Sequence, residues 1–245
     1  MPTYGNGRHE HGQNFLIHPE IRDGIVDLVA ATDGPIVEIG PGRGALTFKL
    51  QDLGRSLTVV EIDTRHARSL RARTVPSTTV VESDFLRWPL PNHPHVIVGN
   101  LPFHQTTAML RRILHAPHWT HAVLLVQWEV ARRRAAVGGA TMMTAQWWPW
   151  MEFTLEGRVP AAAFRPRPTV DGGLLVVSRR REAWLPAADR RRYQRFVHTV
   201  FTGKRRYLDA LLPRGVLPRD LSAAQWVALY RQSVGLSPAS RGRRP

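Results

Sequence analysis

The chain of 245 residues contains no cysteine, only two lysines and no long apolar run. Without cysteine it can form neither a disulfide nor a thiolate metal site. No apolar stretch approaches the roughly 20 residues that a membrane-spanning helix needs. Residues 1–12 are polar and lack the apolar centre of a signal peptide. We therefore expect a cytoplasmic protein that does not enter a membrane.

Charge is abundant and mostly positive: Lys plus Arg is 34 and Asp plus Glu is 19, a formal net charge of +15. Residues 179–245 hold 16 basic and 4 acidic residues, whereas residues 1–178 carry a net charge of only +3. A basic segment beside a nearly neutral one favours binding to a polyanion, although part of it also fits a solvated tail. Because lysine occurs only at Lys49 and Lys204, arginine dominates. This either suits bidentate phosphate contacts or reflects genomic composition.

An apolar run over residues 95–99 predicts a strand, and Asn100-Leu101-Pro102-Phe103 follows it directly. The Asn100 amide can accept a hydrogen bond from the exocyclic amine of a base. Pro102 fixes one backbone dihedral, and Phe103 offers a face for stacking. The four residues also fit an ordinary turn, because Asn and Pro favour turns.

Residues 35–39 predict a buried strand, and the turn Gly40-Pro41-Gly42-Arg43-Gly44 separates it from a helical pattern over residues 45–53. Such a glycine turn lets a nucleotide-like ligand approach the backbone closely. The next predicted strand, 57–60, ends at Glu61, 21 residues after Gly40. An acidic residue at this position suits two ribose hydroxyls. No Lys-Ser or Lys-Thr follows the turn, which disfavours a phosphate-cradling loop.

A third predicted strand, 78–81, leads to Asp84 and Phe85. Asp84 can accept a hydrogen bond from an adenine amine, and Phe85 can pack on a ring. Glu61 also fits a helix N-terminal charge, and Asp84 an ordinary turn. Open parallel sheets bind ligands at the carboxyl ends of their strands. All these signals fall there, so the sequence predicts an α/β fold with a ligand site at that edge.

In their order and spacing, the motifs resemble those of the rRNA adenine N6-methyltransferases. They are Gln13-Asn14-Phe15-Leu16, Glu38 to Gly44, Glu61, Asp84-Phe85, Asn100-Leu101-Pro102-Phe103, and Phe164-Arg165-Pro166-Arg167-Pro168 with Val170. The resemblance covers roughly residues 12–178. Chain length and the closeness of the motifs favour the erythromycin-resistance (Erm) branch, which modifies 23S rRNA and confers macrolide-lincosamide-streptogramin B resistance. Two alternatives are a small-subunit (16S) rRNA dimethyladenosine transferase and a non-catalytic nucleic-acid-binding protein.

The resemblance implies a Rossmann-like methyltransferase domain over residues 1–178 and a small, basic, all-α RNA-binding domain over residues 179–245. It implies S-adenosyl-L-methionine as cofactor, bound by Asn14, Leu16, Gly40, Gly42, Glu61, Asp84 and Asn100. Its catalytic residues would be Asn100, Leu101, Pro102 and Phe103. The Asn100 side chain and the Leu101 carbonyl would accept hydrogen bonds from the target amine, while Phe103 and Phe164 would border a flipped adenine. The expected partner is 23S rRNA, protein-free or in an assembling large subunit, bound by a monomer without a metal.

Several aromatic and basic residues have a second interpretation. Phe15 and Leu16 can plug the core, and Phe164 can shield a sheet edge. Trp147-Trp148-Pro149-Trp150 has apolar neighbours on both sides, so we interpret it as core. Arg132-Arg133-Arg134 lies on a predicted helix and fits a solvated face better than a phosphate contact.

Two motifs depart from the family pattern, and the last part of the chain is helical. Phe103 stands where many relatives have Tyr, but stacking needs only the ring. Asp171-Gly172-Gly173 replaces the more usual Asn-Ser-Ser, which weakens the expected contacts from that loop. Apolar spacing predicts three short helices over residues 189–201, 204–212 and 222–234.

Overall fold

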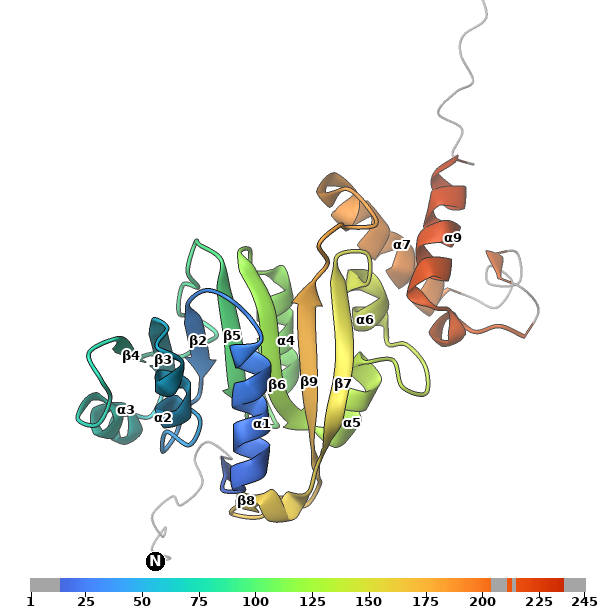
Figure 1. Ribbon diagram of the computed structural model, residues 1–245. Helices are drawn as coiled ribbons and strands as arrows, with labels where there is room; N and C mark the ends of the chain where they lie inside the picture. Colours follow the sequence, from blue (N-terminus) through green and yellow to red (C-terminus); the bar gives the residue numbers. More distant parts are fainter. Residues whose placement is uncertain (1–13, 204–210, 213–214, 236–245) are drawn as a thin grey trace, which may run out of the picture. The chain divides into compact units, whose positions relative to one another are not determined.

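The computed structural model describes residues 14–203, 211–212 and 215–235 (Figure 1). The chain forms two compact units. The first comprises Met1–Ala131 and Thr154–Ser178, and the second Arg132–Phe153 and Arg179–Pro245. The sequence-based division after residue 178 places residues 132–153 in the first domain. In the structure they group with the second unit, because α6 (Met142–Trp147) packs on α7 (Arg190–Thr202).

A seven-stranded sheet in the order β4-β3-β2-β5-β6-β9-β7 forms the scaffold of the fold. Its strands are β2 (Ile36–Ile39), β3 (Leu57–Glu61), β4 (Thr78–Glu82), β5 (His95–Asn100), β6 (Trp119–Gln127), β7 (Met151–Val159) and β9 (Gly172–Arg179). Strands β2 to β6 pair in parallel, and β9 pairs antiparallel with β6. The predicted α/β fold is therefore confirmed, and every predicted strand is present.

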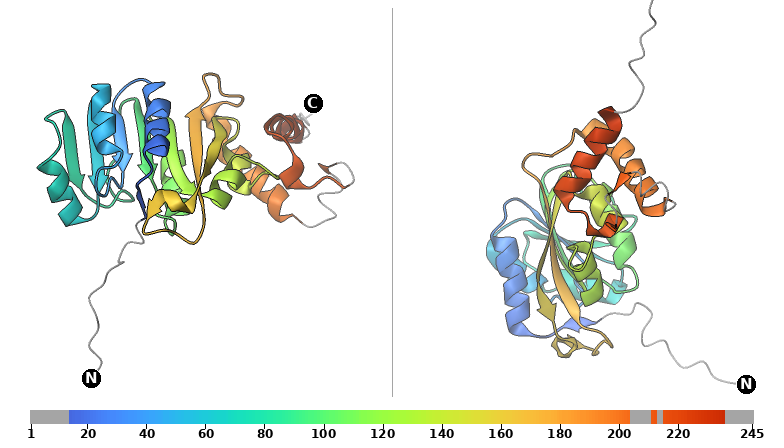
Figure 2. Two further views of the ribbon diagram at one scale, coloured as in Figure 1. Left: turned by 60° about the horizontal axis from the view of Figure 1, so that its bottom comes forward. Right: turned by 90° about the vertical axis from the view of Figure 1, so that its right-hand side faces the viewer.

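Helices cover both faces of the sheet, and α2, α3 and α4 connect its parallel strands. They are α1 (Pro19–Ala30), α2 (Thr47–Leu50) with the 3-10 turn η1 (Gln51–Leu53), α3 (Thr64–Arg71), α4 (Thr106–His115) and α5 (Trp128–Arg134). Figure 2 shows α1 on one face and α4 on the other. Ile25 and Val29 of α1 are buried with Ile36, Val59 and Val98 of the sheet. Burial of strand residues on both faces is typical of a parallel sheet.

Two short strands bring the N-terminal segment to the first unit. Strand β1 (Phe15–Leu16) pairs antiparallel with β8 (Phe164–Arg165), which follows the 3-10 turn η2 (Ala161–Ala163). Phe15 lies opposite Arg165, and Leu16 opposite Phe164. The Ile17 amide then donates to the Ala163 carbonyl at 2.8 Å. These bonds fix the position of residues 14–17.

The second unit is built around aromatic side chains. The Tyr193 ring makes edge contacts with Trp150 and Tyr230, with centroids 5.6 and 5.2 Å apart. Its hydroxyl donates to the Ala145 carbonyl at 3.0 Å, and burial raises the pKa of this phenol. Trp147 and Trp150 are buried, as the core interpretation of the Trp147–Trp150 cluster predicts.

The helices of the second unit fit the predicted pattern in two of three cases. Helices α7 and α9 (Ala223–Gly235) match the predictions over 189–201 and 222–234, and the short turns η3 (Ala187–Asp189) and η4 (Pro218–Asp220) precede them. Most of the predicted helix over 204–212 lies outside the described residues. No described helix is both long and apolar enough to span a membrane.

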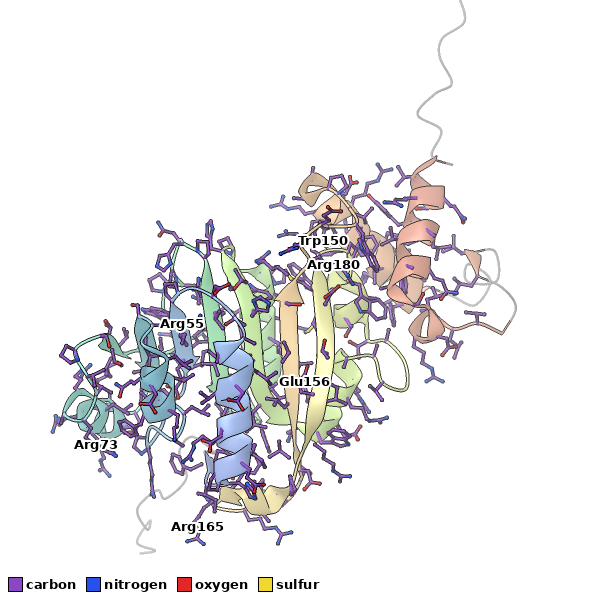
Figure 3. All side chains as sticks on the ribbon, viewed as in Figure 1. Arg55, Arg73, Trp150, Glu156, Arg165 and Arg180 are labelled. Carbon is purple, nitrogen blue, oxygen red and sulfur yellow. The ribbon has the colours of Figure 1, made fainter. Side chains whose placement is uncertain are left out.

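Two arginines of the second unit are bound by neighbours within it. The Arg180 Nε donates to the Trp148 carbonyl at 2.8 Å, and its guanidinium lies 3.8 Å from the centroid of the Trp184 ring. Figure 3 shows Arg180 close to Trp150. The predicted solvated face of residues 132–134 holds only in part, because the Arg134 guanidinium donates to the Thr141 hydroxyl at 2.7 Å.

Candidate active site

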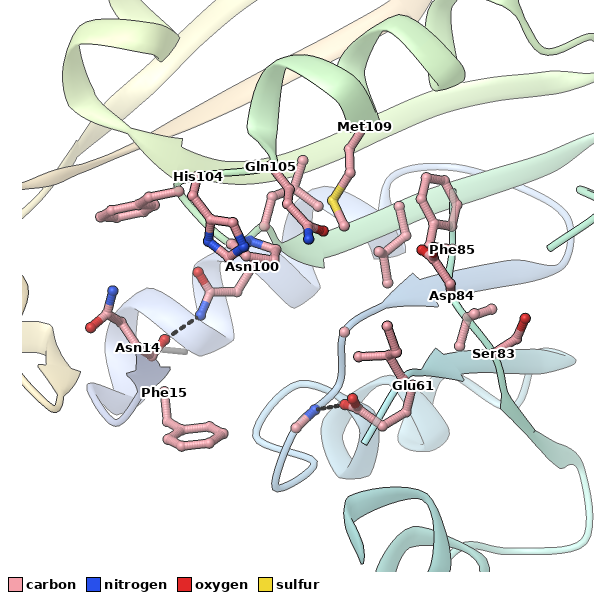
Figure 4. Close-up of a pocket in the computed structure, with 18 residues that line it drawn as sticks. Asn14, Phe15, Glu61, Ser83, Asp84, Phe85, Asn100, His104, Gln105 and Met109 are labelled. Atoms are coloured by element: carbon pink, nitrogen blue, oxygen red, sulfur yellow. Dashed lines mark hydrogen bonds between the residues drawn. The ribbon is translucent and has the colours of Figure 1, made fainter. Parts of the chain in front are cut away.

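A pocket opens in the first unit where β2, β3, β4 and β5 end (Figure 4). It is lined by Asn14, Phe15, Ile39, Gly40, Gly42, Val60, Glu61, Ile62, Ser83, Asp84, Phe85, Asn100, Leu101, Pro102, Phe103, His104, Gln105 and Met109. The carboxyl ends of parallel strands are where such folds bind ligands. The structure therefore brings residues of five separate sequence motifs to one cavity.

The glycine turn requires glycine for two different reasons. Gly40 and Gly42 have φ values of 62° and 54°, a region that L side chains rarely adopt. A Cβ on Gly42 would lie 2.7 Å from the Phe15 ring, so glycine allows Phe15 to pack on the turn. A Cβ on Gly40 would meet no atom within 4 Å, and its absence keeps that part of the pocket open.

Glu61 holds the glycine turn against the end of β3. Its carboxylate accepts hydrogen bonds from the Gly42 amide at 2.8 Å and the Asp63 amide at 2.9 Å, one on each oxygen. The residue is only 1% exposed. Each oxygen keeps a second lone pair, so the carboxylate can still accept from a ligand hydroxyl. Glu61 therefore shapes the turn in addition to facing the pocket.

A second buried carboxyl group, Glu38, lies close to this turn. It is 1% exposed and accepts a hydrogen bond from the Thr47 hydroxyl at 2.7 Å. Burial raises the pKa of Glu38 to about 8, although the bond from Thr47 opposes the shift and the nearby Glu61 charge adds to it. Glu38 is therefore mostly neutral at pH 7.

The wall after β4 combines an acid with apolar surface. One oxygen of Asp84 accepts the Leu86 amide at 2.8 Å, and the other lies 3.8 Å from Arg87 Nε. Phe85 is buried next to it, whereas Ile62, which also lines the pocket, is 48% exposed. This wall offers a planar ring an apolar contact and a hydrogen-bond acceptor.

The turn from Asn100 to Phe103 is fixed at both ends. The Leu101 amide donates to the Leu125 carbonyl of β6 at 2.9 Å, which continues the pairing of β5. The buried Thr106 hydroxyl lies 3.1 Å from the Pro102 carbonyl and 3.3 Å from that of Phe103, and donates to both. The loop is thus held in one conformation before any ligand arrives.

The Asn100 amide is oriented by the N-terminal segment. Its Nδ2 donates to the Asn14 carbonyl at 2.7 Å, as the dashed line in Figure 4 shows. In the part of the chain that the structure describes, neither Asn100 Oδ1 nor the Leu101 carbonyl receives a hydrogen bond. Two oxygen acceptors from adjacent residues thus remain available at the end of β5.

Most of the predicted site residues line the pocket, but two do not. Leu16 is 5% exposed and belongs to the hydrophobic core. Phe164 is 2% exposed, and its ring packs edge-on against Phe103 with centroids 6.4 Å apart. Phe164 therefore supports the Phe103 ring from behind. Gln13 lies outside the described residues.

The sequence motifs missed several lining residues. Ile62, Ser83, His104, Gln105 and Met109 all line the pocket. Ile62 follows Glu61 and Ser83 precedes Asp84 in the sequence. This position next to a predicted site residue is the one feature of the sequence that could have indicated them. His104 and Gln105 directly follow Phe103. Among the described residues, no group of three His, Asp or Glu side chains could hold a metal ion.

Comparison with known proteins agrees with this geometry. The family described as "Ribosomal RNA adenine dimethylase" matches residues 5–227. An rRNA adenine N-6-methyltransferase of Corynebacterium diphtheriae is 56% identical over 215 residues, which cover 87% of this chain and 85% of that protein. The mycinamicin-resistance protein MyrB of Micromonospora griseorubida is 43% identical, covering 99% of this chain and 84% of that protein.

A solved structure has the same fold. The crystal structure of the 23S rRNA methyltransferase ErmE superposes with a TM-score of 0.81 at 32% identity, covering 89% of this chain and 99% of that chain. The family match spans most of the chain, and the site motifs lie together within it. The chain therefore belongs to the ribosomal RNA adenine dimethylase family.

Proposed function

We propose that this protein transfers a methyl group from S-adenosyl-L-methionine to N6 of one adenine in 23S rRNA, and so confers resistance to macrolide-type antibiotics. The observation that carries the proposal is the pair of oxygen acceptors at Asn100 and Leu101, with the Asn100 nitrogen already bonded to Asn14. The names of its relatives, an rRNA adenine N-6-methyltransferase and a mycinamicin-resistance protein, support the same reaction.

The pocket fits the proposed cofactor. When bound, S-adenosyl-L-methionine supplies a methyl group on a sulfonium sulfur. Gly40 leaves room for close approach to the turn, and Glu61 has lone pairs for ribose hydroxyls. Ile62 and Phe85 provide apolar surface for a purine ring, and Asp84 can accept from its amine. Asn14 and Phe15 close the pocket on the side of the N-terminal segment.

The loop at Asn100 fits an adenine amine as the acceptor of the methyl group. An exocyclic amine is a poor nucleophile because its lone pair is delocalised into the ring. Asn100 Oδ1 and the Leu101 carbonyl can each accept one N–H, which directs the lone pair out of the ring plane. Phe103 offers a stacking face for the flipped base, and Phe164 supports that ring. Positioning of this kind supplies a large part of catalysis.

The reaction so described needs no strong general base before transfer. The amine proton becomes acidic only as the new nitrogen–carbon bond forms, and it is then released to water. Asn100 and Leu101 supply neutral oxygens, which hold that proton in place without removing it early. The role of the two residues is therefore to orient the amine.

We assign RNA binding outside the pocket to the second unit and propose that the protein acts as a monomer in the cytoplasm. Helix α7 exposes Arg191, Arg192 and Arg195. Guanidinium groups on one helix suit contacts to successive phosphates. The uneven charge of the chain supports this role.

The resistance phenotype tests the proposal. The wild-type protein and Asn100→Ala are expressed in a macrolide-susceptible bacterium, and the inhibitory concentration of erythromycin is measured. We expect a large increase with the wild type alone. No increase from soluble wild-type protein would contradict the proposal. Restored 16S rRNA methylation in a strain that lacks its own small-subunit adenine dimethylase would support the small-subunit alternative.

A further inference from the structure

Gln105 places a second side-chain amide in the pocket. It precedes α4, where its backbone amide donates to the Pro102 carbonyl and its carbonyl accepts from the Met109 amide, both at 3.0 Å. Its side chain makes no capping bond to the helix, and the described residues give it no other hydrogen bond. Figure 4 shows the amide pointing into the pocket near Asn100. The side chain is therefore available to a ligand.

Asn100 and Leu101 offer two oxygen acceptors to an amine in the pocket. One N–H of Asn100 Nδ2 is donated to the Asn14 carbonyl, which orients Oδ1 as one of these acceptors. Adenine carries, beside its amine, the ring nitrogens N1 and N7, which are acceptors and need a donor. The Gln105 Nε2 has two N–H groups. Gln105 can thus supply a hydrogen-bond donor beside the two acceptors of Asn100 and Leu101.

Other side-chain donors of the pocket are placed less well for this role. Ser83 follows β4, which lies three strands from β5 in the sheet. With neighbouring strands about 4.8 Å apart, this is roughly 14 Å from Asn100. His104 is exposed, and Asn14 belongs to the N-terminal segment that closes the cofactor side of the pocket. Gln105, in contrast, is half-buried in the turn that contains Asn100. The geometry therefore singles out Gln105.

We infer that Gln105 is a specificity-determining residue for the target base. Its amide donates a hydrogen bond to the ring nitrogen beside the amine, N1 or N7, while Asn100 and Leu101 accept from the amine. Adenine matches this donor and acceptor arrangement. Guanine and uracil place a carbonyl oxygen where adenine has its amine. That oxygen would face the acceptor oxygens of Asn100 and Leu101 and could not form a hydrogen bond with them. The inference rests on the proposed function, because it names the group that reads the same target.

Deaza analogues test the inference directly. A short RNA hairpin carries the mapped target as adenine, 1-deazaadenine or 7-deazaadenine, and kcat/KM is measured for each. For the wild type, one of the two analogues should lower kcat/KM about tenfold, as expected for one lost hydrogen bond. Gln105→Leu should lower kcat/KM on adenine by a similar factor and no longer distinguish that analogue. Gln105→Glu, which lacks the donor, should be worse still.

Two further measurements separate the possible outcomes. Thr107→Ala, on the exposed side of α4, is the matched control and should behave like the wild type. Unchanged kcat/KM in Gln105→Leu, or full analogue discrimination in that variant, would overturn the inference. A raised Kd for S-adenosyl-L-methionine by calorimetry, with discrimination intact, would assign the amide to the cofactor and also overturn it. Failure of the wild type to methylate any rRNA while binding cofactor would instead remove the proposed function.

Discussion

The side-chain nitrogen of Asn100 donates a 2.7 Å hydrogen bond to the backbone carbonyl of Asn14, 86 residues earlier in the chain. This bond leaves Oδ1 of the same amide facing the pocket as an acceptor. Asn14 itself lines the pocket, and the next residues form β1. The segment that closes the cofactor side of the pocket thus also orients the group that receives the target amine.

Substitution of Asn100 should separate orientation from simple acceptor capacity. Asn100→Ala should abolish transfer while changing the Kd for S-adenosyl-L-methionine only modestly. Asn100→Asp keeps an acceptor and the same size but cannot donate to the Asn14 carbonyl. We expect it to lose about 100-fold or more in kcat, on the order of 3 kcal/mol. Single-turnover kinetics and calorimetry measure the two quantities. An Asn100→Asp variant with nearly wild-type turnover would show that the Asn14 bond does not matter.

The Thr106 hydroxyl should stabilise the loop as well as the fold. Thr106→Val leaves the carbonyls of Pro102 and Phe103 without this donor, which should lower the free energy of unfolding by about 1 to 3 kcal/mol. Turnover should fall as well, because the loop loses its fixed conformation. Thr106→Ser keeps the hydroxyl and serves as the control in urea unfolding and kinetic assays. A Thr106→Val variant as stable and as active as the wild type would contradict this role of the hydroxyl.

Gly42 should tolerate alanine poorly because of Phe15. Gly42→Ala combines an unfavourable φ with a Cβ placed 2.7 Å from the Phe15 ring. We expect the Kd for S-adenosyl-L-methionine to rise about tenfold or more, and Phe15→Ala in the same chain to recover part of it. Gly54→Ala is the matched control, since Gly54 also has a positive φ of 65° but open space around it. If both glycine variants bind cofactor equally well, the packing argument fails.

Glu38 should make stability depend on pH. Folding raises its pKa from 4.5 to about 8, so the folded protein holds a proton that the unfolded chain loses between these values. The free energy of unfolding should therefore fall as pH rises through this window. Because the Glu38→Gln side chain stays neutral at every pH, this variant should lack the fall, which in the wild type amounts to at most about 5 kcal/mol. Urea unfolding at several pH values measures this free energy of unfolding. Glu156→Gln, on an exposed side chain labelled in Figure 3, should show no such change.

The exposed arginines of α7 should contribute to RNA affinity through charge. Changing Arg191, Arg192 and Arg195 together to Gln should weaken binding to any RNA sequence. The slope of log Kd against log salt concentration should fall by about 2 to 3, because each phosphate contact contributes roughly 0.7 to 0.9. Fluorescence anisotropy over a range of KCl concentrations measures the Kd for RNA and therefore this slope. An unchanged slope would show that these side chains do not contact phosphate.

Local patterns in the sequence predicted the scaffold closely. The predicted strand over residues 95–99 is β5, which extends one residue further because Asn100 pairs with Leu125. The predicted helix over residues 45–53 is shorter: it begins at Thr47 and continues as a 3-10 turn. Apolar periodicity reports burial, and burial decides where strands and long helices form.

Contacts between distant residues were not predictable in this way. The bond from Asn100 to Asn14 joins segments 86 residues apart, and β1 and β8 contain two residues each, too few to show a period. Leu16 and Phe164 are buried because β1 pairs with β8, where the two residues lie opposite each other. Gln105 carries no motif of its own, and only its place in the pocket reveals it.

Methyl transfer from labelled S-adenosyl-L-methionine to purified rRNA tests the central claim most directly. The wild type and Asn100→Ala are incubated with protein-free 23S rRNA, 16S rRNA and assembling small subunits, and the labelled base is mapped. We predict label at one adenine of protein-free 23S rRNA with the wild type and none with Asn100→Ala. Label confined to small-subunit RNA, or no label despite bound cofactor, would contradict the account.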